Sequence, residues 1–553
     1  MKTEIIELKI KGMTCDSCAT HVSKALASVN GVETVKINGW KSGHATVNLK
    51  EKVDSETLIA AVKKAGYGAE LETKFIAEEN KNTSPGKTDF DLIIIGGGSA
   101  AFAAALKASE FGKKVLMIND GLPIGGTCVN VGCVPSKTLI RTAEQFHIAN
   151  NPNFTGIKSG GNKIDFKEVI RQKTELVTDL RQGKYIDVLK DDENVTIIKA
   201  YSKIVGKNTV EADNKKFTAD YILIAAGSTT FVPDIPGLKD AGYLINDTLY
   251  ELEELPEHLI VIGGRYIALE NAQLFARLGS KVTILQRSNR ILPDEMPDIS
   301  ESLREYLEQE GIEIKTGVKI KSVEKKNGRI SINAAVKDEN EVIEGTHIFV
   351  ATGRKGNTKG IGLEELGIEL HKQSFIKTNE YLQTPVPNIY AAGDITGEYL
   401  FVYSAAYEGS LAVENMFGET QNKKDYSVFP WVIFTDPQTA GVGMDENQAF
   451  EANIDYEVST VQLKDVPRSL AARNTKGFIK LIRNKENDKL IGARILVPEG
   501  SELLMEISLA IKYGVTVKEL KQMFHPYLTL SEGVKIAAIG FDKDVKKLSC
   551  CAV

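Results

Sequence analysis

The chain has 553 residues, more than one hydrophobic core usually serves, so we expect several domains. Its 42% hydrophobic and 26% charged residues are typical of a globular protein and exclude a disordered or collagen-like chain. The net charge of -6 gives no electrostatic reason to bind nucleic acid or an anionic membrane. The first residues do not resemble a secretory signal, and no stretch predicts a transmembrane helix. We expect a cytoplasmic protein with no nucleic-acid partner and no stable membrane insertion.

The first part of the chain predicts a small βαββαβ domain. Charged and apolar residues alternate as in strands at three places, and apolar residues recur at helical spacing at two. The strand-like stretches are 3–10, 32–37 and 43–49, and the helix-like ones are 16–28 and 54–65. This order within about 75 residues is typical of a ferredoxin-like module. The polar stretch that follows contains Pro85 and Gly86 and predicts a flexible linker.

A first dinucleotide-binding fold begins after the linker. A short apolar strand at 90–95 leads into a G-x-G-x-x-A turn formed by Gly96, Gly98 and Ala101, and an Ala-rich helix and a second strand follow. The glycines permit a tight turn and let a pyrophosphate approach the backbone at the helix N-terminus. Asn119 replaces the acid that usually binds the ribose, so the sequence does not identify the residue that contacts the ribose.

A second fold of this kind contains the turn Gly263-Gly264, again between a strand and a helix. Arg265 stands where the second motif glycine would be, so the match is weaker. After the next strand the chain has Arg287 and Arg290 in place of an acid. Positive charge there suits a 2′-phosphate, which favours NADPH over NADH. The alternative is that both arginines are ordinary surface charge.

All cysteines occur in close pairs. There are six of them: Cys15 and Cys18, Cys128 and Cys133, Cys550 and Cys551. In a reducing cytosol, such pairs are more often redox centres or soft-metal sites than structural disulfides. We therefore treat all six as candidate ligands of a soft metal ion.

Residues 125–137 (GGTCVNVGCVPSK) resemble the redox-active segment of the FAD-dependent pyridine nucleotide-disulphide oxidoreductases. Two thiols separated by four residues at the start of a helix can share a soft ion, and the helix dipole lowers their pKa. The resemblance implies that Cys133 lies against the flavin and that Cys128 is the outer, exchanging thiol. It also implies that Lys137 and Glu270 form a pair near the reactive part of the flavin.

The resemblance covers the chain from about residue 90 to its end. It implies an α/β fold with two Rossmann-like domains, for FAD and NADPH, and a C-terminal α+β domain that forms a homodimer with shared active sites. The expected domains are 1–75 (metal-binding), 76–88 (linker), 89–245 and 365–423 (FAD), 246–364 (NADPH) and 424–553 (dimerisation). Further expected cofactor-binding residues are Gly126, Thr127, Gly227, Gly353 and Asp394.

Residues 12–18 (GMTCDSC) resemble the metal-binding loop of heavy-metal-associated domains. Two thiolates on a loop before a helix give a low-coordination site that suits soft ions such as Cu(I) or Hg(II). A thioredoxin-like redox role is the alternative for any C-x-x-C pair. The βαββαβ setting and Met13 favour metal binding by Cys15 and Cys18.

The C-terminal sequence LSCCAV resembles the tail of mercuric reductases. A mobile dithiol such as Cys550 and Cys551 can accept a thiophilic ion by ligand exchange and pass it inward. Tyr185 and Tyr403 match two tyrosines of the same family, which implies that they flank the metal beside the inner thiols. Aromatic packing is the alternative for both.

The segment with His525 resembles one in which disulfide reductases use a His as the acid-base residue and a following Glu as its carboxylate partner. The spacing from His525 to Glu532 is two residues too long for that pattern. Mercury reduction has no leaving thiolate to protonate, so we leave His525 out of the catalytic set.

These resemblances imply that NADPH, through FAD and the Cys128–Cys133 pair, reduces Hg(II) to volatile Hg(0), with small thiols as partners and mercury resistance as the outcome. One alternative is a thioredoxin- or dithiol-type disulfide reductase with an appended metal-binding domain. Another is a protein that only binds metal ions, which leaves both nucleotide folds without a role.

Overall fold

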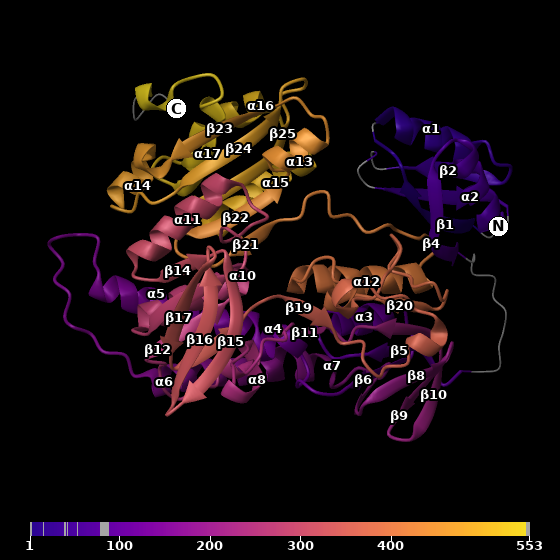
Figure 1. Ribbon diagram of the computed structural model, residues 1–553, viewed down its shortest axis with the longest axis horizontal. Coiled ribbons are helices and arrows are strands. Elements are labelled where there is room, and N and C mark those ends of the chain that lie inside the picture. The colour runs from indigo at the N-terminus through magenta and orange to yellow at the C-terminus, as the bar shows by residue number, and fades with distance from the viewer. Residues whose placement is uncertain are drawn as a thin grey trace. The chain divides into compact units, whose positions relative to one another are not determined.

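The computed structural model describes residues 3–14, 16–37, 40, 43–51, 53–77 and 88–548. The chain forms two compact units, each built from three separate stretches. The first comprises Met1–Asn130, Leu180–Thr229 and Arg354–Lys424, and the second comprises Val131–Asp179, Thr230–Gly353 and Asp425–Val553. Figure 1 labels most of the longer helices and strands.

The N-terminal part has the predicted βαββαβ order, with an antiparallel sheet in the order β2-β3-β1-β4. Apolar side chains such as Leu8, Val22 and Val47 are fully buried between the sheet and its two helices. The second helix begins where the Asp54 side chain accepts a hydrogen bond from the Glu56 amide. The elements are β1 (Thr3–Lys11), α1 (Asp16–Ala27), β2 (Val32–Lys36), β3 (His44–Leu49), α2 (Ser55–Lys64) and β4 (Gly68–Ala77). The predicted linker lies mostly outside the described residues.

The rest of the first unit is built on a sheet in the order β7-β6-β5-β10-β9-β8, with β20 also pairing to β10. Strand β5 is apolar on both faces: Leu92 and Ile94 belong to one core, and Ile93 to another. Such continuous burial is typical of a parallel strand covered on both sides. The strands are β5 (Phe90–Ile95), β6 (Val115–Asn119), β7 (Val195–Lys199), β8 (Ser202–Gly206), β9 (Thr209–Ala212), β10 (Lys215–Ile224), β11 (Ser228–Thr230), β19 (Arg354–Gly356) and β20 (Ile389–Ala391).

Helices α3 and α12 lie side by side on this sheet (Figure 1). A Cβ at Gly409 would be 2.2 Å from the Ala100 carbonyl oxygen, so only glycine allows this close approach. The helices of this unit are α3 (Ser99–Glu110), α4 (Gly126–Val131), η2 (Gln182–Ile186), α7 (Asp187–Leu189), η3 (Glu364–Leu366), η4 (Lys372–Ser374), η5 (Gly393–Thr396) and α12 (Val402–Phe417).

The second unit contains the second dinucleotide fold, a parallel sheet in the order β14-β13-β12-β18. Leu259 and Val261 of β12 face one core, and Ile260 faces the core formed with the antiparallel strands β15-β16-β17. The elements are α5 (Cys133–Asn150), α6 (Phe166–Arg181), α8 (Leu238–Ala241), α9 (Asn246–Leu249), β12 (His258–Ile262), α10 (Tyr266–Leu278), β13 (Lys281–Gln286), α11 (Pro297–Gln309), β14 (Glu313–Thr316), β15 (Val318–Lys326), β16 (Arg329–Val336), β17 (Glu339–Gly345) and β18 (His347–Val350).

The C-terminal part of this unit is an antiparallel sheet in the order β21-β22-β25-β24-β23, with α15 and α17 packed against it. The strands are β21 (Trp431–Ile433), β22 (Gln438–Gly443), β23 (Tyr456–Gln462), β24 (Phe478–Asn484) and β25 (Leu490–Val497). The helices are α13 (Glu446–Glu451), η6 (Leu463–Asp465), α14 (Pro467–Ala471), η7 (Gly500–Leu503), α15 (Leu504–Lys512), α16 (Val517–Gln522), α17 (Leu530–Ile539) and η8 (Val545–Lys547).

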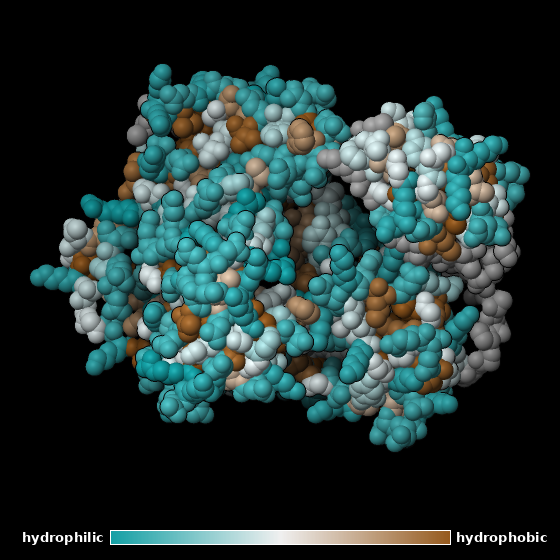
Figure 2. Space-filling view, viewed as in Figure 1, coloured by the Kyte–Doolittle hydropathy of each residue, from teal (hydrophilic) through white to brown (hydrophobic). Residues whose placement is uncertain are grey.

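The visible surface is mainly hydrophilic, with hydrophobic residues in small groups (Figure 2). Within the part of the chain that the structure describes, every helix is too short or too polar to cross a membrane.

Three partly buried histidines of the second unit predict a loss of stability in acid. Burial is the main cause that lowers the pKa of His147, His258 and His347 below the usual 6.5, and the positive charge of Arg277 adds to the effect at His147. As the pH falls through 6.5, the unfolded chain therefore binds protons before the folded one does, and their contribution to stability is lost.

We expect the thermal unfolding temperature of the wild type to fall more between about pH 7.5 and about pH 5.5 than that of a His258→Gln variant. The exposed His371, changed to Gln, is the matched control and should leave the pH slope unchanged. An unchanged slope in His258→Gln would contradict the assignment.

Candidate functional site

The first dinucleotide turn forms a cradle of backbone atoms. Gly96 has φ +129°, and a Cβ there would be 2.1 Å from the Ala225 carbonyl oxygen. A Cβ at Gly126 would be 2.6 Å from the Gly98 Cα, so two loops approach each other through glycines. Gly98 is also the N-cap of α3. A pyrophosphate can reach the helix N-terminus through such a cradle, so these residues fit the FAD predicted here.

Two residues close to this turn, Ala101 and Asn119, have structural roles. Ala101 is in the first turn of α3 and is fully buried in the core that this helix shares with β5, where a larger side chain would separate the helix from the sheet. The Asn119 side chain lies over Gly97, since a Cβ there would be 2.6 Å from it, and it donates a hydrogen bond of 3.0 Å to the Leu122 carbonyl. Asn119 therefore orders the loop that follows β6.

Asp394 is held by two residues that the sequence did not single out as site residues. The Ser228 hydroxyl donates to Asp394 Oδ2 at 2.7 Å, and Arg354 Nε donates to the same hydroxyl at 2.6 Å. Arg354 Nε is also 3.5 Å from Asp394 Oδ2. Both partners directly follow predicted glycines, Gly227 and Gly353, which have φ of +69° and +118°. Their place beside these motifs is a signal that could have identified them.

The redox segment forms two helices, so the prediction that both thiols stand at the start of one helix is wrong. Cys128 lies within α4, whereas Cys133 is the first residue of α5. Gly132 between them has φ -124° and ψ -109°, which is not helical. The two cysteines belong to different compact units. Only Cys133 stands at the start of a long helix, where the dipole favours a thiolate.

Asn130 of the same segment orders the loop before Cys128. Its side-chain amide donates to the carbonyls of Pro123, Ile124 and Gly126 at 3.0, 3.2 and 2.8 Å. Arg181 in turn donates to Asn130 Oδ1 at 3.0 Å. This one side chain therefore fixes the start of α4, which carries Thr127 and Cys128.

Lys137 and Glu270 lie together, as the resemblance implies. Lys137 Nζ is 2.7 Å from Glu270 Oε2, and the Glu270 side chain is 7% exposed. Glu270 Oε1 accepts a hydrogen bond of 2.9 Å from the Phe434 amide. Lys137 is four residues after Cys133 on α5, so both stand on one face of that helix.

The two predicted tyrosines lie in the first unit. Tyr185 is in the short π-helix η2, and its ring meets Phe102 edge to face at 4.9 Å between centroids. A Cβ at Gly125 would be 3.3 Å from the Tyr185 ring, which places this ring beside the segment that leads to Cys128. Tyr403 is the second residue of α12, stacks on Phe401 at 5.3 Å between ring centroids and is 43% exposed. Their role as metal neighbours stays a prediction.

The second dinucleotide turn repeats the first in its geometry. Gly263 has φ +126°, and a Cβ there would be 2.3 Å from the Ala351 carbonyl oxygen. A Cβ at Gly264 would be 3.0 Å from the Gln286 side chain. Arg265, the N-cap of α10, pairs with the exposed Asp294. The turn therefore has the close packing that a bound dinucleotide needs.

The two arginines predicted to hold a 2′-phosphate differ in their surroundings. Arg287 is exposed and directly follows β13. Arg290 is partly buried and donates to the carbonyls of Pro293 and Glu295 at 3.1 and 2.9 Å. Arg287 is thus the more available of the two cations.

Of the predicted metal ligands at the chain ends, only Cys18 is described, and Cys15, Cys550 and Cys551 lie outside the described residues. Cys18 is in the first turn of α1, with Thr14 Oγ1 3.7 Å from its Sγ. Among the described residues, no group of three or more His, Cys, Asp and Glu is arranged to hold a metal ion.

His525 does not pair with Glu532. Its Nε2 is 2.6 Å from Glu506 Oε1. Glu532 is buried and accepts a hydrogen bond of 3.1 Å from the Leu528 amide. The two residues therefore do not form the His–Glu pair of disulfide reductases, in agreement with their spacing in the sequence.

Comparison with known proteins agrees with this architecture. Residues 90–409 match the pyridine nucleotide-disulphide oxidoreductases, residues 429–538 match the dimerisation domain of that family, and residues 7–68 match the heavy-metal-associated domain. Mercuric reductases of Lysinibacillus sphaericus and Staphylococcus aureus are 41% and 40% identical, each over 99% of this chain and 99% of their own length. The HOCl-induced flavoprotein disulfide reductase RclA of Escherichia coli has a similar structure, with 28% identity and a TM-score of 0.74 over 81% of this chain and 99% of its own. The chain therefore belongs to the mercuric reductases within the pyridine nucleotide-disulphide oxidoreductase family.

Proposed function

We propose that this protein reduces Hg(II) to volatile Hg(0) with electrons from NADPH and thereby gives the cell resistance to mercury. FAD and NADPH are its cofactors, and Hg(II) is its substrate. The observation that carries the proposal is the likeness to mercuric reductases along the whole chain, with 41% identity over 99% of both sequences. We place the reaction in the cytoplasm, where NADPH and small thiols that carry Hg(II) are present.

The chemistry is a transfer of two electrons. FAD, which the glycine turn at Gly96 and Gly98 and the carboxylate of Asp394 would hold, would supply the transfer of two electrons from NADPH to Hg(II), with one proton released. In this proposal Cys128 and Cys133 bind Hg(II) as thiolates, the ligand type that soft ions prefer. The position of Cys133 at the start of α5 favours its thiolate form. Neutral mercury has little affinity for thiolate and leaves.

The remaining cysteines form the proposed delivery route. Cys15 and Cys18 capture Hg(II), and the tail residues Cys550 and Cys551 of one subunit receive it and pass it to the inner pair of the other. Each step exchanges one thiolate ligand for another, so the ion is never left without ligands. In this proposal the metal-binding, linker, FAD, NADPH and dimerisation regions are separated at residues 75, 88, 245, 364 and 423.

The protein forms a homodimer through its dimerisation domain. This region carries large apolar side chains that the single chain leaves exposed, and exposed apolar patches are typical of protein interfaces. Phe524 is 99% exposed, Tyr513 79% and Met505 59%. We propose that these residues form part of the contact between subunits.

Replacing Phe524 by Asp is expected to shift the protein from dimer to monomer, because a carboxylate would be buried without a partner at the interface. Light scattering at several protein concentrations measures this shift. Val342 is 61% exposed on β17, outside the dimerisation domain, and is the matched control, since Val342→Asp should leave the dimer intact. A dimeric Phe524→Asp variant would remove Phe524 from the proposed interface.

The function itself is tested with the purified flavoprotein, by measuring NADPH oxidation with Hg(II) in excess thiol while mercury vapour is trapped from the headspace. One Hg(0) released per NADPH oxidised is the expected result. NADPH oxidation that requires a disulfide and releases no mercury would instead identify a dithiol reductase, and would return His525 to the catalytic set.

A further inference from the structure

A polar face of α10 binds the segment that leads from β21 to β22. Gln273 and Arg277 follow Glu270 by three and by seven residues, so the three side chains lie on one side of the helix. Glu270 accepts from the Phe434 amide at 2.9 Å. Gln273 accepts from the Asp436 amide at 2.7 Å and donates to the Asp436 carbonyl at 2.8 Å. This face of α10 therefore holds the backbone of the segment at Phe434 and at Asp436.

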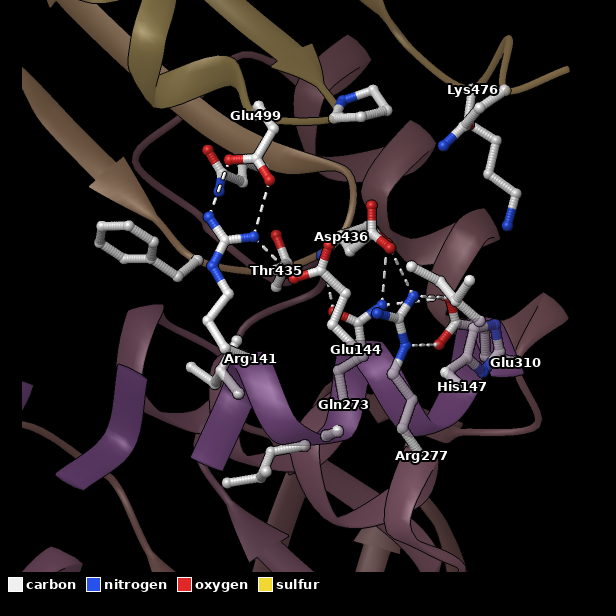
Figure 3. Close-up of a pocket in the computed structure, with 18 of the residues that line it drawn as sticks. Arg141, Glu144, His147, Gln273, Arg277, Glu310, Thr435, Asp436, Lys476 and Glu499 are labelled. Atoms are coloured by element: carbon white, nitrogen blue, oxygen red, sulfur yellow. Dashed lines mark hydrogen bonds and ion pairs between the residues drawn. The ribbon is translucent and has the colours of Figure 1, made fainter. Parts of the chain in front are cut away.

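Arg277 anchors the far end of this contact. It donates to Glu310 through two hydrogen bonds of 2.7 Å each, and to Asp436 Oδ2 at 2.9 Å. Figure 3 shows Gln273 and Arg277 pointing toward Asp436, with Glu310 beside Arg277, in the wall of a pocket of about 570 Å³. The side chains of Arg277 and Glu310 are each 6% exposed. Burial alone would raise the pKa of Glu310, but the hydrogen bonds and charge of Arg277 outweigh it and lower that pKa, so Glu310 stays ionised.

The same segment supports the Lys137 ammonium. Lys137 Nζ is 2.7 Å from Glu270 and 4.6 Å from the centre of the Phe434 ring. Glu270 accepts a hydrogen bond from the Phe434 amide. Gln273 accepts one from the amide of Asp436, two residues further along the same segment. Both contacts of the ammonium therefore depend on where residues 434–436 lie.

We infer that Gln273 is a positioning residue for Lys137: its paired hydrogen bonds to the Asp436 backbone hold the Phe434 ring and the Glu270 carboxylate under the Lys137 ammonium. This inference deepens the proposed function, because it rests on Lys137 lying near the flavin. Gln273 is 4% exposed, and a side chain without its amide leaves the N–H and C=O of Asp436 without these two hydrogen-bond partners. The segment must then shift to find new ones, and Lys137 shifts with it.

The test replaces Gln273 by Met, which has a similar length but lacks both hydrogen-bonding groups, and measures the midpoint potential of the bound flavin. A cation close to the flavin stabilises its reduced, anionic form, so displacing Lys137 makes the potential more negative. We expect the equilibrium constant for flavin reduction to fall about tenfold, which is about 30 mV for a two-electron couple. Gln273→Asn keeps the amide but shortens its reach, and should give a smaller shift in the same direction.

A double-mutant cycle separates positioning from a general loss of stability. Lys137→Met alone should also lower the potential, and Gln273→Met should add no further shift once Lys137 is gone. Lys480→Met is the matched control, since Lys480 is 1% exposed and pairs with Asp298 and Glu446 at 2.7 and 2.5 Å on other elements. It should reduce stability and leave the potential unchanged.

An unchanged potential in Gln273→Met, or the same shift with and without Lys137, would overturn the inference. Neither measurement uses mercury. A protein that shows the coupled shift but releases no Hg(0) would therefore refute the proposed function and leave the positioning role intact.

Discussion

Replacing Cys133 by Ser is expected to lower Hg(II) turnover by about a thousandfold or more, which is about 4 kcal/mol of transition-state stabilisation, while NADPH still reduces the bound flavin. A hydroxyl is a poor ligand for a soft ion, so the inner site loses one of its two thiolates. Serine keeps the size of the residue and is well tolerated at a helix start, where Cys133 is the first residue of α5. The fold should therefore survive the change.

Two measurements on the same sample separate the half-reactions. Flavin absorbance after mixing with NADPH reports the first, and mercury vapour in the headspace reports the second. Cys18→Ser makes the same chemical change in the N-terminal domain and is the control, with turnover near that of the wild type in excess thiol. Hg(0) release by Cys133→Ser at the wild-type rate would show that this sulfur is not a ligand of the reacting ion.

Features that depend on neighbouring residues could be predicted from the sequence. The strand, glycine turn and helix around Gly96 and around Gly263 form as expected, because each motif specifies its own backbone. Strand β5 could be placed for the same reason, since its run of apolar residues predicts burial on both faces. The order of elements in the N-terminal domain follows from its strand-like alternation and from the helical spacing of its apolar residues.

Features that join distant parts of the chain could not be predicted in this way. Ser228 is 166 residues from Asp394, and Gln273 is 163 residues from Asp436, so the sequence does not show that either pair is in contact. The position of Ser228 beside Gly227 could have marked it as a site residue, but not its partner. The break between α4 and α5 was also missed. Gly132 allows it at little cost, but a single glycine in a helical pattern does not by itself decide between a break and a continuous helix.

Replacing Gly263 by Ala is expected to lower kcat/KM for NADPH by about a hundredfold, or about 3 kcal/mol, without loss of FAD. The added Cβ would be 2.3 Å from the Ala351 carbonyl oxygen, at a φ of +126° that alanine rarely adopts. The backbone between β12 and α10 must open to relieve this contact. That movement displaces the helix N-terminus where the pyrophosphate of NADPH would bind. Steady-state kinetics and the flavin content of the purified variant test the two parts of this expectation.

Gly279 provides the control, because it ends the same helix with φ +116° but has nothing within 4 Å of an added Cβ. Gly279→Ala therefore introduces the backbone strain, about 1 to 3 kcal/mol, without the clash. If strain alone were responsible, both variants would lose stability and NADPH affinity alike. We expect Gly279→Ala to lose stability only, because its end of α10 is remote from the turn. An unchanged kcat/KM in Gly263→Ala would instead mean that the nicotinamide nucleotide does not bind at this turn.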